Sequence, residues 1–511
     1  MMAETADMKA PDSGVTVRMY RQGHGDCFLL TFPRDGGGPP VFMLIDCGKK
    51  DGSQITRSGK EVTAKDVVAD IRRATGGRLD VVAVTHEHVD HVNILPLFKD
   101  FEIGQAWFAW TEDPTDDLAN DLRRRHGDQV LGLIGAQNRL AAAGDANAGL
   151  VAARIGQFLD TALGSNGAAP GFGVAANPLN STNKKAMKVI KDLAGGRLEF
   201  IRPHEAVRRI PGVAGLCVYP LGPPRSEALL RDEDPKGDAA FPGHGVAGGS
   251  LSFFAAARDG GGDDGGAPFG VEYGLAVETA LDDPDHGGFI RRHYGRGPTD
   301  DDVKARQVHD AADWRRIDTD WLYAAESFAL KLTEGINNTS LVLAFELPQS
   351  RKVLLFAADA QNGNWMTWAN GRFRDGDRVV TPRDLLSRTV LYKVGHHGSH
   401  NATLTGTADS AWANLAWMGE GAARREFTAM ITAHRDWAIN KAGWDHPLAA
   451  IRTALLTKAE GRVLQLDMDD LAQPADVPQA DWASFAARTR VTDLFIEHTV
   501  LDDPPGPANA G

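Results

Sequence analysis

Cysteine is scarce in this chain, which has only Cys27, Cys47 and Cys217 among its 511 residues. Three thiols cannot form a framework of disulfide bonds, so we expect a protein of the reducing cytoplasm and not a disulfide-stabilised secreted scaffold. No apolar run approaches the roughly 18 residues that a membrane span needs, so we expect no membrane association. Residues 1–14 lack the basic and then apolar order of a signal peptide, and we expect them to form a flexible tail.

An excess of positive charge is also missing, because the formal net charge is -13. A protein that binds nucleic acid through its overall charge is basic, so a polyanionic substrate of this chain must be held by local positive charge or by metal. Basic clusters do occur, for example Arg123 to Arg125 in "DLRRRHGD". We expect them to form solvated surface paired with acids, and a grip on phosphate groups is the alternative.

Apolar segments rich in Val, Leu and Ile recur along the chain and end in Asp or His. Such runs are typical of strands buried on both faces by helices, and polar residues at the strand ends of an α/β sheet gather at one edge. The segments are "VFMLIDCG" (41–48) with Asp46, "LDVVAVTHEHVDH" (79–91) with its histidines, "KVLLFAADAQNGN" with Asp359, "TVLYKVGHHGSHNAT" (389–403) with His396 and His397, and "EFTAMITAHRD" (426–436) with His434. "SLVLAFELP" predicts a hairpin with the third segment, and Pro348 to Arg351 lie between the two strands. The pattern predicts the α/β (α+β) class.

Two long regions between these segments have a different composition. Residues 113–200 contain helix-like stretches rich in Ala, Arg and Asp, whereas residues 225–320 are rich in Gly and Asp, as loops are. We expect one domain over residues 15–500 with these two regions as insertions. The insertions are candidates for a lid, for an oligomer contact or for binding a protein partner. Residues 501–511 are rich in Pro and Gly and predict a flexible tail.

The segment "THEHVDH" holds three histidines and two acids within six positions. His86 and His88 are two residues apart, so an extended backbone points both imidazoles to the same side. Asp90 and His91 follow as the chain turns, so the first pair can bind one metal ion and the second pair another. Imidazole nitrogen and carboxylate oxygen are ligands that Zn²⁺ accepts. The segment therefore favours a metal site over a solvated cluster of histidines.

Together these motifs resemble those of hydrolases with the metallo-β-lactamase fold. "THEHVDH" is similar to the metal-binding signature of that superfamily. "YRQGHGDCFLLTFP" with "VFMLIDCG" resembles the opening "GQGD … LIDxG" of the ComEC-like branch, the hydrolase domain of a competence DNA-uptake protein and its stand-alone relatives. "INNTSLVLAFE", "LLFAADAQ", "YKVGHHGSHNAT" and "HPLAAIRTAL" are similar to later segments of this branch. The resemblance omits both insertions, and it implies a four-layer αβ/βα sandwich with two metal ions at the edge of its sheets.

The resemblance also implies a role for each candidate residue. The implied metal ligands are His86, His88, Asp90, His91, Asp359 and His397, with Asp359 bridging two divalent cations. We expect Zn²⁺, with Mn²⁺ or iron as alternatives. Asp46 would orient the ligands from behind them. His397 is our preferred ligand and His396 the residue that faces substrate, although the sequence alone does not separate these two. The implied catalytic residues are Asp90, His396 and His434, and the implied substrate contacts are Ser399, His400, Asn401, Asn338 and His446.

Two departures from the resembling motifs leave questions open. Many superfamily members have a further histidine for the first metal where this chain reads "GINNTSL", so water, Asn338, His204 or His244 could complete that site. The chain also has Ala358 where the branch has Gly before the bridging acid, and so loses a flexible residue. For His24 and Asp26 in "GHGD", turn chemistry and proximity to the site are equal alternatives.

The implied function is hydrolysis of a phosphodiester by a hydroxide that two metal ions share. A phosphate-containing substrate is favoured by the branch, and nucleic acid is one candidate. Hydrolysis of a carbonyl substrate such as a lactone, a thioester or a β-lactam is the alternative, because one fold supports several chemistries. A scaffold that has lost catalysis is a third hypothesis, and the intact ligand positions weaken it.

Overall fold

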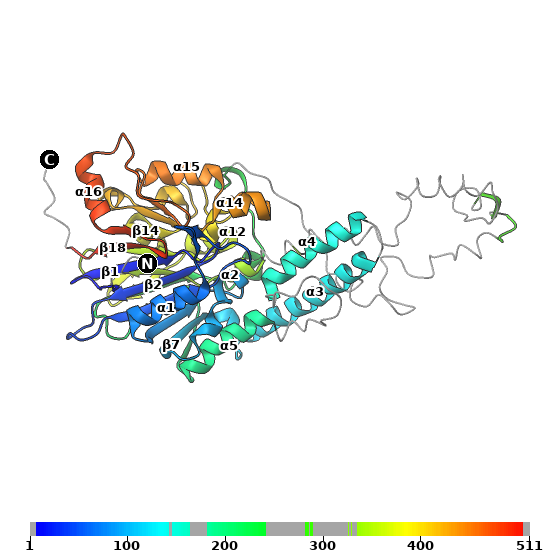
Figure 1. Cartoon of the computed structure of the whole chain (residues 1–511), viewed down its shortest axis with the longest axis horizontal. Helices are drawn as coiled ribbons and strands as arrows, with labels where there is room; N and C mark the ends of the chain where they lie inside the picture. The colour runs from blue at the N-terminus through cyan, green and yellow to red at the C-terminus, as the bar shows by residue number, and fades with distance from the viewer. Residues whose placement is uncertain are drawn as a thin grey trace.

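The structure is a computed structural model that describes residues 7–142, 146–163, 181–241 and 335–503, with a few more positions between 282 and 329. Its described elements form two mixed β-sheets and helices packed on them (Figure 1). This confirms the α/β class. None of the helices in the described part of the chain has both the length and the apolar composition needed to cross a bilayer.

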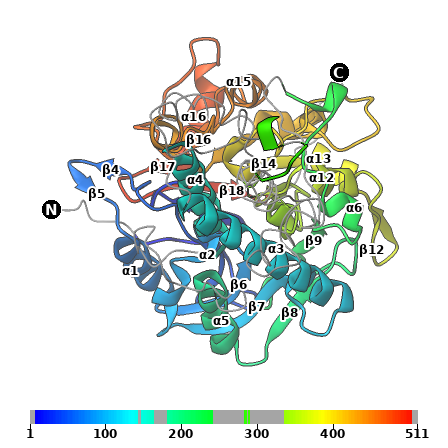
Figure 2. The same cartoon turned by 90° about the vertical axis from the view of Figure 1, so that its right-hand side faces the viewer.

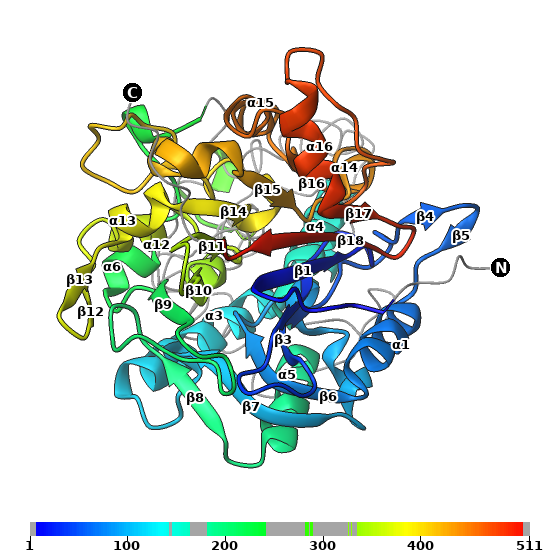
Figure 3. The same ribbon diagram turned by 90° about the vertical axis from the view of Figure 1, so that its left-hand side faces the viewer.

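The larger sheet of the described residues has eight strands in the order β17-β18-β1-β2-β3-β6-β7-β8. Its strands are β1 (Gly14–Tyr20), β2 (Cys27–Phe32), β3 (Val41–Cys47), β6 (Arg78–Val84), β7 (Glu102–Ala109), β8 (Leu198–Ile201), β17 (Thr489–Val491) and β18 (Phe495–Leu501). The strands from β3 to β8 run parallel, and those from β17 to β3 pair antiparallel. The first and the last described strands, β1 and β18, therefore lie side by side in this sheet (Figure 3).

The smaller sheet has six strands in the order β16-β15-β14-β11-β10-β9. Its strands are β9 (Cys217–Gly222), β10 (Val342–Glu346), β11 (Val353–Phe356), β14 (Thr389–Lys393), β15 (Thr428–Ile431) and β16 (Val463–Gln465). β10 and β11 pair antiparallel with Phe345 opposite Leu354, as the predicted hairpin requires. Two small hairpins, β4 (Thr56–Arg57) with β5 (Lys60–Glu61) and β12 (Phe373–Asp375) with β13 (Arg378–Val380), lie outside the two main sheets.

The two sheets share one apolar core. Leu30 and Met43 of the larger sheet and Phe345, Leu354 and Met430 of the smaller sheet are all buried in it. Because successive side chains of a strand point to opposite faces, the intervening residues enter two further cores on the outer sides. Strands buried on both faces have no place for a polar side, which explains their continuous apolar runs.

Helices cover the outer face of each sheet. α1 (Ala64–Thr75) and α5 (Thr182–Ala194) share a core with the larger sheet. α12 (Asn362–Trp368), α13 (Pro382–Ser387) and α15 (Ala449–Lys458) share one with the smaller sheet. α16 (Gln479–Ala487) instead contributes Trp482 and Phe485 to the core between the sheets.

The connection from β3 through α1 to β6 aligns two of the strand ends that the sequence singles out. Thr63 begins α1 with a capping box in which it exchanges hydrogen bonds with Asp66. Gly76 ends the helix in the left-handed conformation, at a φ of 64°. The chain then returns as a parallel neighbour of β3, with Ile45 opposite Ala83. The carboxyl ends of β3 and β6 therefore lie at the same edge of the sheet.

The described residues between β7 and β8 include the α-helices α3 (Asp117–Ala142), α4 (Ala146–Leu163) and α5. α3 and α4 project beyond the sheets and bury a core of their own that includes Leu133 and Ile155 (Figure 1). α4 also contacts α2 (Val89–Val92), the short helix of the histidine motif (Figure 2). Most of the predicted Gly/Asp-rich insertion at 225–320 and the residues beyond 503 lie outside the described part of the chain.

Candidate metal centre

The structure brings together the six residues that the sequence predicts as metal ligands. Two groups offer ligand atoms that all lie within 4.8 Å of one another, namely Asp90, His91, Asp359 and His397, and His86, His88 and Asp359. Asp359 belongs to both groups, as the implied bridging role requires. None of the six residues is more than 3% exposed. These buried groups could hold a metal ion.

Two glycines allow the histidine motif to approach the ends of β2 and β3. A Cβ atom at Gly48 would lie 2.4 Å from the carbonyl carbon of Asp90, and one at Gly25 would lie 2.6 Å from the Asp90 oxygen. No side chain fits at either place. The "GHGD" and "IDCG" motifs therefore each supply a surface against which α2 packs.

Backbone strain is concentrated at the centre. Asp46, Ala358, His396 and His397 have φ values of 54°, 47°, 38° and 54°, a left-handed region that residues with a Cβ rarely adopt. Ala358 thus has a backbone conformation that favours glycine. Glycine is the residue that the ComEC-like motif has at this position. Strain of this kind persists where the surroundings fix the backbone, and it clusters at functional sites.

Asp46 fixes the orientation of His91. The backbone N–H and the hydroxyl of Thr85 donate to Asp46 at 2.8 and 2.6 Å, and His91 Nδ1 lies 2.8 Å from Asp46 Oδ2. This contact directs the other nitrogen, Nε2, to within 3.1 Å of Asp359 Oδ2. Burial alone would lower the pKa of His91, but Asp359 and Asp26 raise it well above its usual range. The neighbouring carboxylates thus favour positive charge on the imidazole of His91.

His86 and His88 are suited to bind a metal ion as neutral imidazoles. Burial and the neighbouring His91 hold the pKa of His86 well below its usual range. Burial and Lys50 lower the pKa of His88 to about 3. Nδ1 of His86 lies 3.1 Å from the Thr85 hydroxyl, so its Nε2 faces Asp359, with 3.8 Å to Oδ2.

Six atoms of the candidate ligands are buried without a hydrogen-bond partner among the described residues. They are Nε2 of His86, His88 and His91, Oδ1 of Asp90, and both carboxylate oxygens of Asp359. Buried polar atoms without a partner are rare in proteins, because leaving one unpaired costs about 1–3 kcal/mol. Imidazole nitrogen and carboxylate oxygen form the donor set of Zn²⁺, so a divalent metal ion fits these residues.

Asp90 and His397 form the other side of the centre. His397 Nε2 lies 3.0 Å from Asp90 Oδ2, and Lys50 Nζ lies 2.9 Å from Asp90 Oδ1. The Thr432 hydroxyl donates to Asp26 at 2.6 Å, so it can only accept from His397 Nδ1, 2.9 Å away. This assigns Nε2 of His397 as the nitrogen with a lone pair for a metal. Although burial opposes it, Lys50 helps to hold the pKa of Asp90 well below its usual range.

The sequence matches no model of a known protein family and no curated protein. The likeness of its short motifs to metallo-β-lactamase fold hydrolases therefore remains a prediction from the sequence. The buried cluster of imidazoles and carboxylates is the structural observation on which a function can be based.

The geometry favours His397 over His396 as a ligand. Both lie in the turn of 3₁₀ helix Gly395–Gly398 that follows β14. The side chain of His397 is 1% exposed and its Nε2 lies 3.0 Å from Asp90 Oδ2, whereas the side chain of His396 is 19% exposed. The distances of their Nε2 atoms to Asp359 Oδ2 are similar, at 3.8 Å for His397 and 3.9 Å for His396. Burial lowers the pKa of His396 to about 4. His396 is therefore a neutral, partly exposed imidazole next to the candidate ligands.

Some residues at the centre were not predicted from the sequence. Lys393, on β14, lies 2.5 Å from Asp26 Oδ2 and 3.6 Å from Asp359 Oδ1, and its side chain is 1% exposed. A lysine inside the apolar run "TVLYKV" was the available signal, since a buried lysine needs an acidic partner. Lys50, which follows β3, was also missed. For Asp26, turn chemistry and proximity to the site were equal alternatives. Its ion pair with Lys393 places it at the site.

His24 and His446 lie beside the candidate ligands. The ring of His24 is fully buried, 4.4 Å from the ring of His397 between centroids, and neither of its nitrogens has a hydrogen bond within the described residues. His446 stacks on His24 at 5.6 Å and meets His396 at 5.3 Å. Trp437 and Trp444, both half-buried, lie next to His24. We call His24, His446 and these two tryptophans the aromatic wall. The place predicted for His446 near the site agrees with the structure.

Asn338 and His204 differ from expectation. Asn338 is fully buried, and its amide bonds only to backbone, accepting from the N–H groups of Gln361 and Asn364. These bonds fix the turn after Asp359. Because the amide oxygen is occupied there, Asn338 is not placed to contact substrate or to complete the first metal site. His204 Nε2 lies 3.1 Å from the carbonyl of Thr367 and does not join the cluster. His244, the other candidate, lies outside the described residues.

Other predicted site residues form their hydrogen bonds outside the group of candidate ligands. His434 Nδ1 donates to the carbonyl of Ser53 at 2.7 Å, and no hydrogen bond or ion pair within the described residues joins it to the cluster. Ser399 donates to Asn401 at 3.1 Å, and His400 Nε2 lies 3.1 Å from Asp234. A direct role of these side chains in catalysis or substrate binding stays a prediction.

The arginines of the basic cluster on α3 are bound to other groups of the chain. This agrees with the interpretation of the cluster as surface paired with acids. Arg125 pairs with Glu227 and with Asp121, and Arg124 also contacts Asp121. Arg123 donates to the carbonyl of Asp113 at 2.9 Å. These arginines are engaged by the chain itself.

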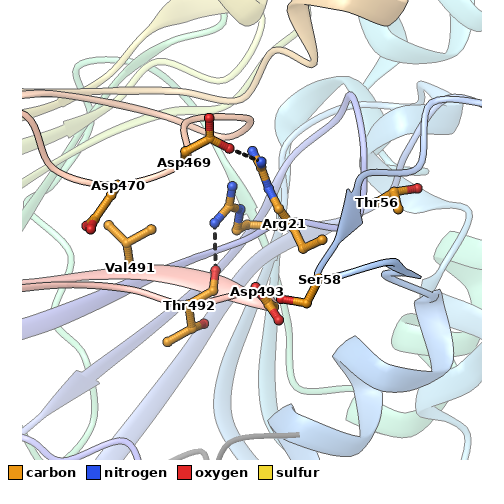
Figure 4. Close-up of a pocket in the computed structure, with 9 residues that line it drawn as sticks. Arg21, Thr56, Ser58, Asp469, Asp470, Val491, Thr492 and Asp493 are labelled. Carbon is orange, nitrogen blue, oxygen red and sulfur yellow. Dashed lines mark hydrogen bonds and ion pairs between the residues drawn. The ribbon is translucent and has the colours of Figure 1, made fainter.

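A separate pocket of about 340 Å³ shares no residue with the metal centre (Figure 4). Arg21 in its wall donates to the carbonyls of Thr492 and Leu466 at 2.6 and 2.9 Å. Arg57 pairs with Asp469. Both arginines of this pocket are therefore engaged by groups of the chain itself.

Proposed function

We propose that this protein is a metal-dependent hydrolase of phosphodiesters that works with two divalent cations, most readily Zn²⁺. The observation that supports it is the position of Asp359, a buried carboxylate that belongs to both groups of candidate ligands. A carboxylate shared by two sets of imidazoles is suited to bridge two cations. The two mixed sheets, with helices on their outer faces, also support the αβ/βα sandwich that the motifs imply.

Each group would hold one cation. His86, His88 and Asp359 would bind the first, and Asp90, His91, His397 and Asp359 the second. Two bound cations would supply a nucleophile at neutral pH and charge that stabilises the oxygens of a displacement reaction. Three protein ligands at the first site leave a position open, as catalytic zinc sites do.

The remaining residues of the centre would keep these ligands in place. Asp46 and Thr432 each bond to the Nδ1 atom of one histidine, and this leaves both Nε2 atoms for metal. Such outer partners fix the tautomer and the ring orientation. His396, partly exposed at the rim, would donate to an oxygen of the substrate.

The positive charge that a phosphate-containing substrate requires would come mainly from the bound cations. The chain has a net charge of -13, and Lys50 and Lys393 at the centre are each paired with a carboxylate, Asp90 and Asp26. The resemblance of the motifs to a branch that acts on phosphodiesters supports a substrate of this kind. The same residues could instead hydrolyse a carbonyl substrate. A comparison of substrates must distinguish this alternative from phosphodiester hydrolysis.

The test is hydrolysis of bis(p-nitrophenyl) phosphate by the full chain with Zn²⁺ or Mn²⁺, beside a lactone and a thioester. We expect metal-dependent turnover of the phosphodiester. Asp359→Asn should lower it by more than about 100-fold, because even the outer partners of a metal site contribute about 10- to 100-fold. Asp375→Asn, which changes a carboxylate of β12 instead, is the matched control. Turnover of the carbonyl substrates alone, or wild-type protein that neither binds metal nor turns over, contradicts the proposal.

A further inference from the structure

Lys50 lies at the candidate metal centre and has no role in the ligand set. Its side chain is 11% exposed, and Nζ lies 2.9 Å from Asp90 Oδ1. Nζ also donates to the hydroxyl of Thr161 at 3.2 Å. Thr161 belongs to the last turn of α4, so this contact joins the metal centre to the helical segment between β7 and β8.

The ammonium group has capacity for one more partner. It carries three N–H groups, of which Asp90 and Thr161 take at most two. Within the described residues no third acceptor is present, and Nζ lies 5.5 Å from the ring centroid of Trp444. Trp444 is half-buried and contacts His446 and His24, so Lys50 faces the aromatic wall at the rim of the centre. A cation near an aromatic face is stabilised while it stays able to donate a hydrogen bond.

The helical segment holds Lys50 from the other side. The Thr161 hydroxyl donates to the carbonyl of Gln157 at 3.2 Å, which leaves its oxygen to accept from Lys50. Asn183, at the start of α5, donates to the carbonyl groups of Thr161 and Ala162, at 3.1 and 3.2 Å, and satisfies the end of α4. Its amide also lies 3.4 Å from the carbonyl of Glu87, between the two histidines of the first group.

The end of α4 is also electrostatically favourable for this lysine. The carboxyl end of a helix carries partial negative charge, which attracts a cation that lies next to its last turn. Lys50 therefore has a carboxylate on one side and a helix end on the other. Both fix the ammonium group next to the candidate ligands.

We infer that Lys50 binds the anionic group of the substrate, and that α4 positions it through Thr161. The inference rests on the proposed function, which makes this anionic group a phosphate. The free N–H of Lys50 donates to a phosphoryl oxygen of a substrate bound next to Asp90. The helical segment is thereby part of the binding wall, because it holds the ammonium group of Lys50 in place.

Binding of orthophosphate to the zinc-loaded full chain, measured by calorimetry, tests this inference without relying on turnover. Lys50→Met should weaken phosphate binding by about 10- to 100-fold, the size expected for one charge-assisted hydrogen bond. Lys50→Arg should restore part of the affinity, because it keeps the charge and a donor. Thr161→Val, which removes only the hydroxyl that positions Lys50, should weaken binding several-fold. Lys49→Met removes the same charge at the neighbouring residue and should change little.

The zinc content and the KM and kcat values for bis(p-nitrophenyl) phosphate separate the possible roles. A raised KM in Lys50→Met with unchanged zinc content agrees with phosphate binding by Lys50. Unchanged phosphate affinity in both Lys50→Met and Thr161→Val overturns the inference. Loss of zinc from Lys50→Met, with unchanged phosphate affinity in Thr161→Val, overturns it as well and leaves Lys50 as a partner of Asp90 only. If wild type binds phosphate through Lys50 but hydrolyses no phosphodiester, the proposed function fails and this inference stands.

Discussion

His91 Nδ1 lies 2.8 Å from Asp46 Oδ2, and this contact determines which nitrogen of His91 can face a metal ion. Asp46 also accepts two hydrogen bonds from Thr85, so both of its oxygens are occupied. The orientation of His91 is therefore set by the neighbouring strands β3 and β6. A metal ion would meet an imidazole that is already in place.

Asp46→Asn should weaken metal binding by about 10- to 100-fold, because an amide cannot accept from both Thr85 and His91 as the carboxylate does. The affinity can be measured by competition with a chromogenic chelator. Asp80→Asn is the control, since Asp80 is a buried carboxylate on β6 that accepts from the N–H of Phe42 at 3.0 Å. It should lower stability and leave metal affinity unchanged. Equal metal affinity in Asp46→Asn and wild type would contradict the role given to Asp46.

Substitution of His396 and of His397 should have different effects on metal content and on kcat. His397→Ala should lose one of two bound metal ions, because its Nε2 faces Asp90 in the buried centre. His396→Ala should keep both ions and lower kcat for the phosphodiester, since its imidazole lies at the rim. Metal content by mass spectrometry, combined with steady-state kinetics, measures both effects. The reverse pattern, with metal lost only from His396→Ala, would exchange the two assignments.

The convergence of the ligands could be predicted from the sequence because local rules determine it. His86 and His88 alternate along an extended backbone, and Asp46 ends an apolar run that is a parallel neighbour of the run before His86. The carboxyl ends of parallel strands share an edge, so residues far apart in the chain are brought together there. No knowledge of side-chain contacts is needed for this step.

Side-chain partners could not be predicted in the same way, because they depend on the packed fold. Asn338 has the right residue type near the centre, yet its amide is used by the backbone N–H groups of a turn. The contact between Lys50 and Thr161 joins residues 111 positions apart, on a loop and a helix that share no motif. Lys393 was hidden in an apolar run, where alternation does not reveal an acidic partner from another strand.

The ion pair of Lys393 with Asp26 should contribute strongly to stability. Burial alone would lower the pKa of Lys393, but Asp26 and Asp359 raise it, so the ammonium form is retained in the core. Lys393→Met leaves Asp26 without its cation and should cost about 3–5 kcal/mol in the free energy of unfolding. Urea denaturation of the metal-free protein measures this.

Two further variants control for this effect. Asp26→Asn combined with Lys393→Met should recover part of the loss, because the unpaired charge is then gone. Lys352→Met breaks a more exposed pair with Glu426, whose side chain is 27% exposed, and should cost no more than about 1 kcal/mol. A loss in Lys393→Met as small as in Lys352→Met would show that the buried pair is not stabilising.

His498 should make the protein sensitive to acid at a place that shares no contact with the metal centre. It is 2% exposed on β18, and its Nδ1 lies 2.8 Å from the Thr489 hydroxyl, which itself donates to the carbonyl of Phe485. Burial, with the nearby Arg488, lowers the pKa of His498 to about 3. Folded His498 therefore stays neutral at a pH where the unfolded chain, with a pKa of 6.5, takes up a proton.

The contribution of His498 is complete above pH 6.5 and is lost as the pH falls from 6.5 toward 3. Between pH 7.5 and pH 5 the loss should be about 2 kcal/mol in the free energy of unfolding. His498→Gln keeps a donor for Thr489 and cannot take up a proton. Urea denaturation at both pH values should therefore show a smaller decrease for the variant than for wild type, by about the same 2 kcal/mol. Equal decreases in the two proteins would mean that His498 titrates alike in the folded and unfolded states.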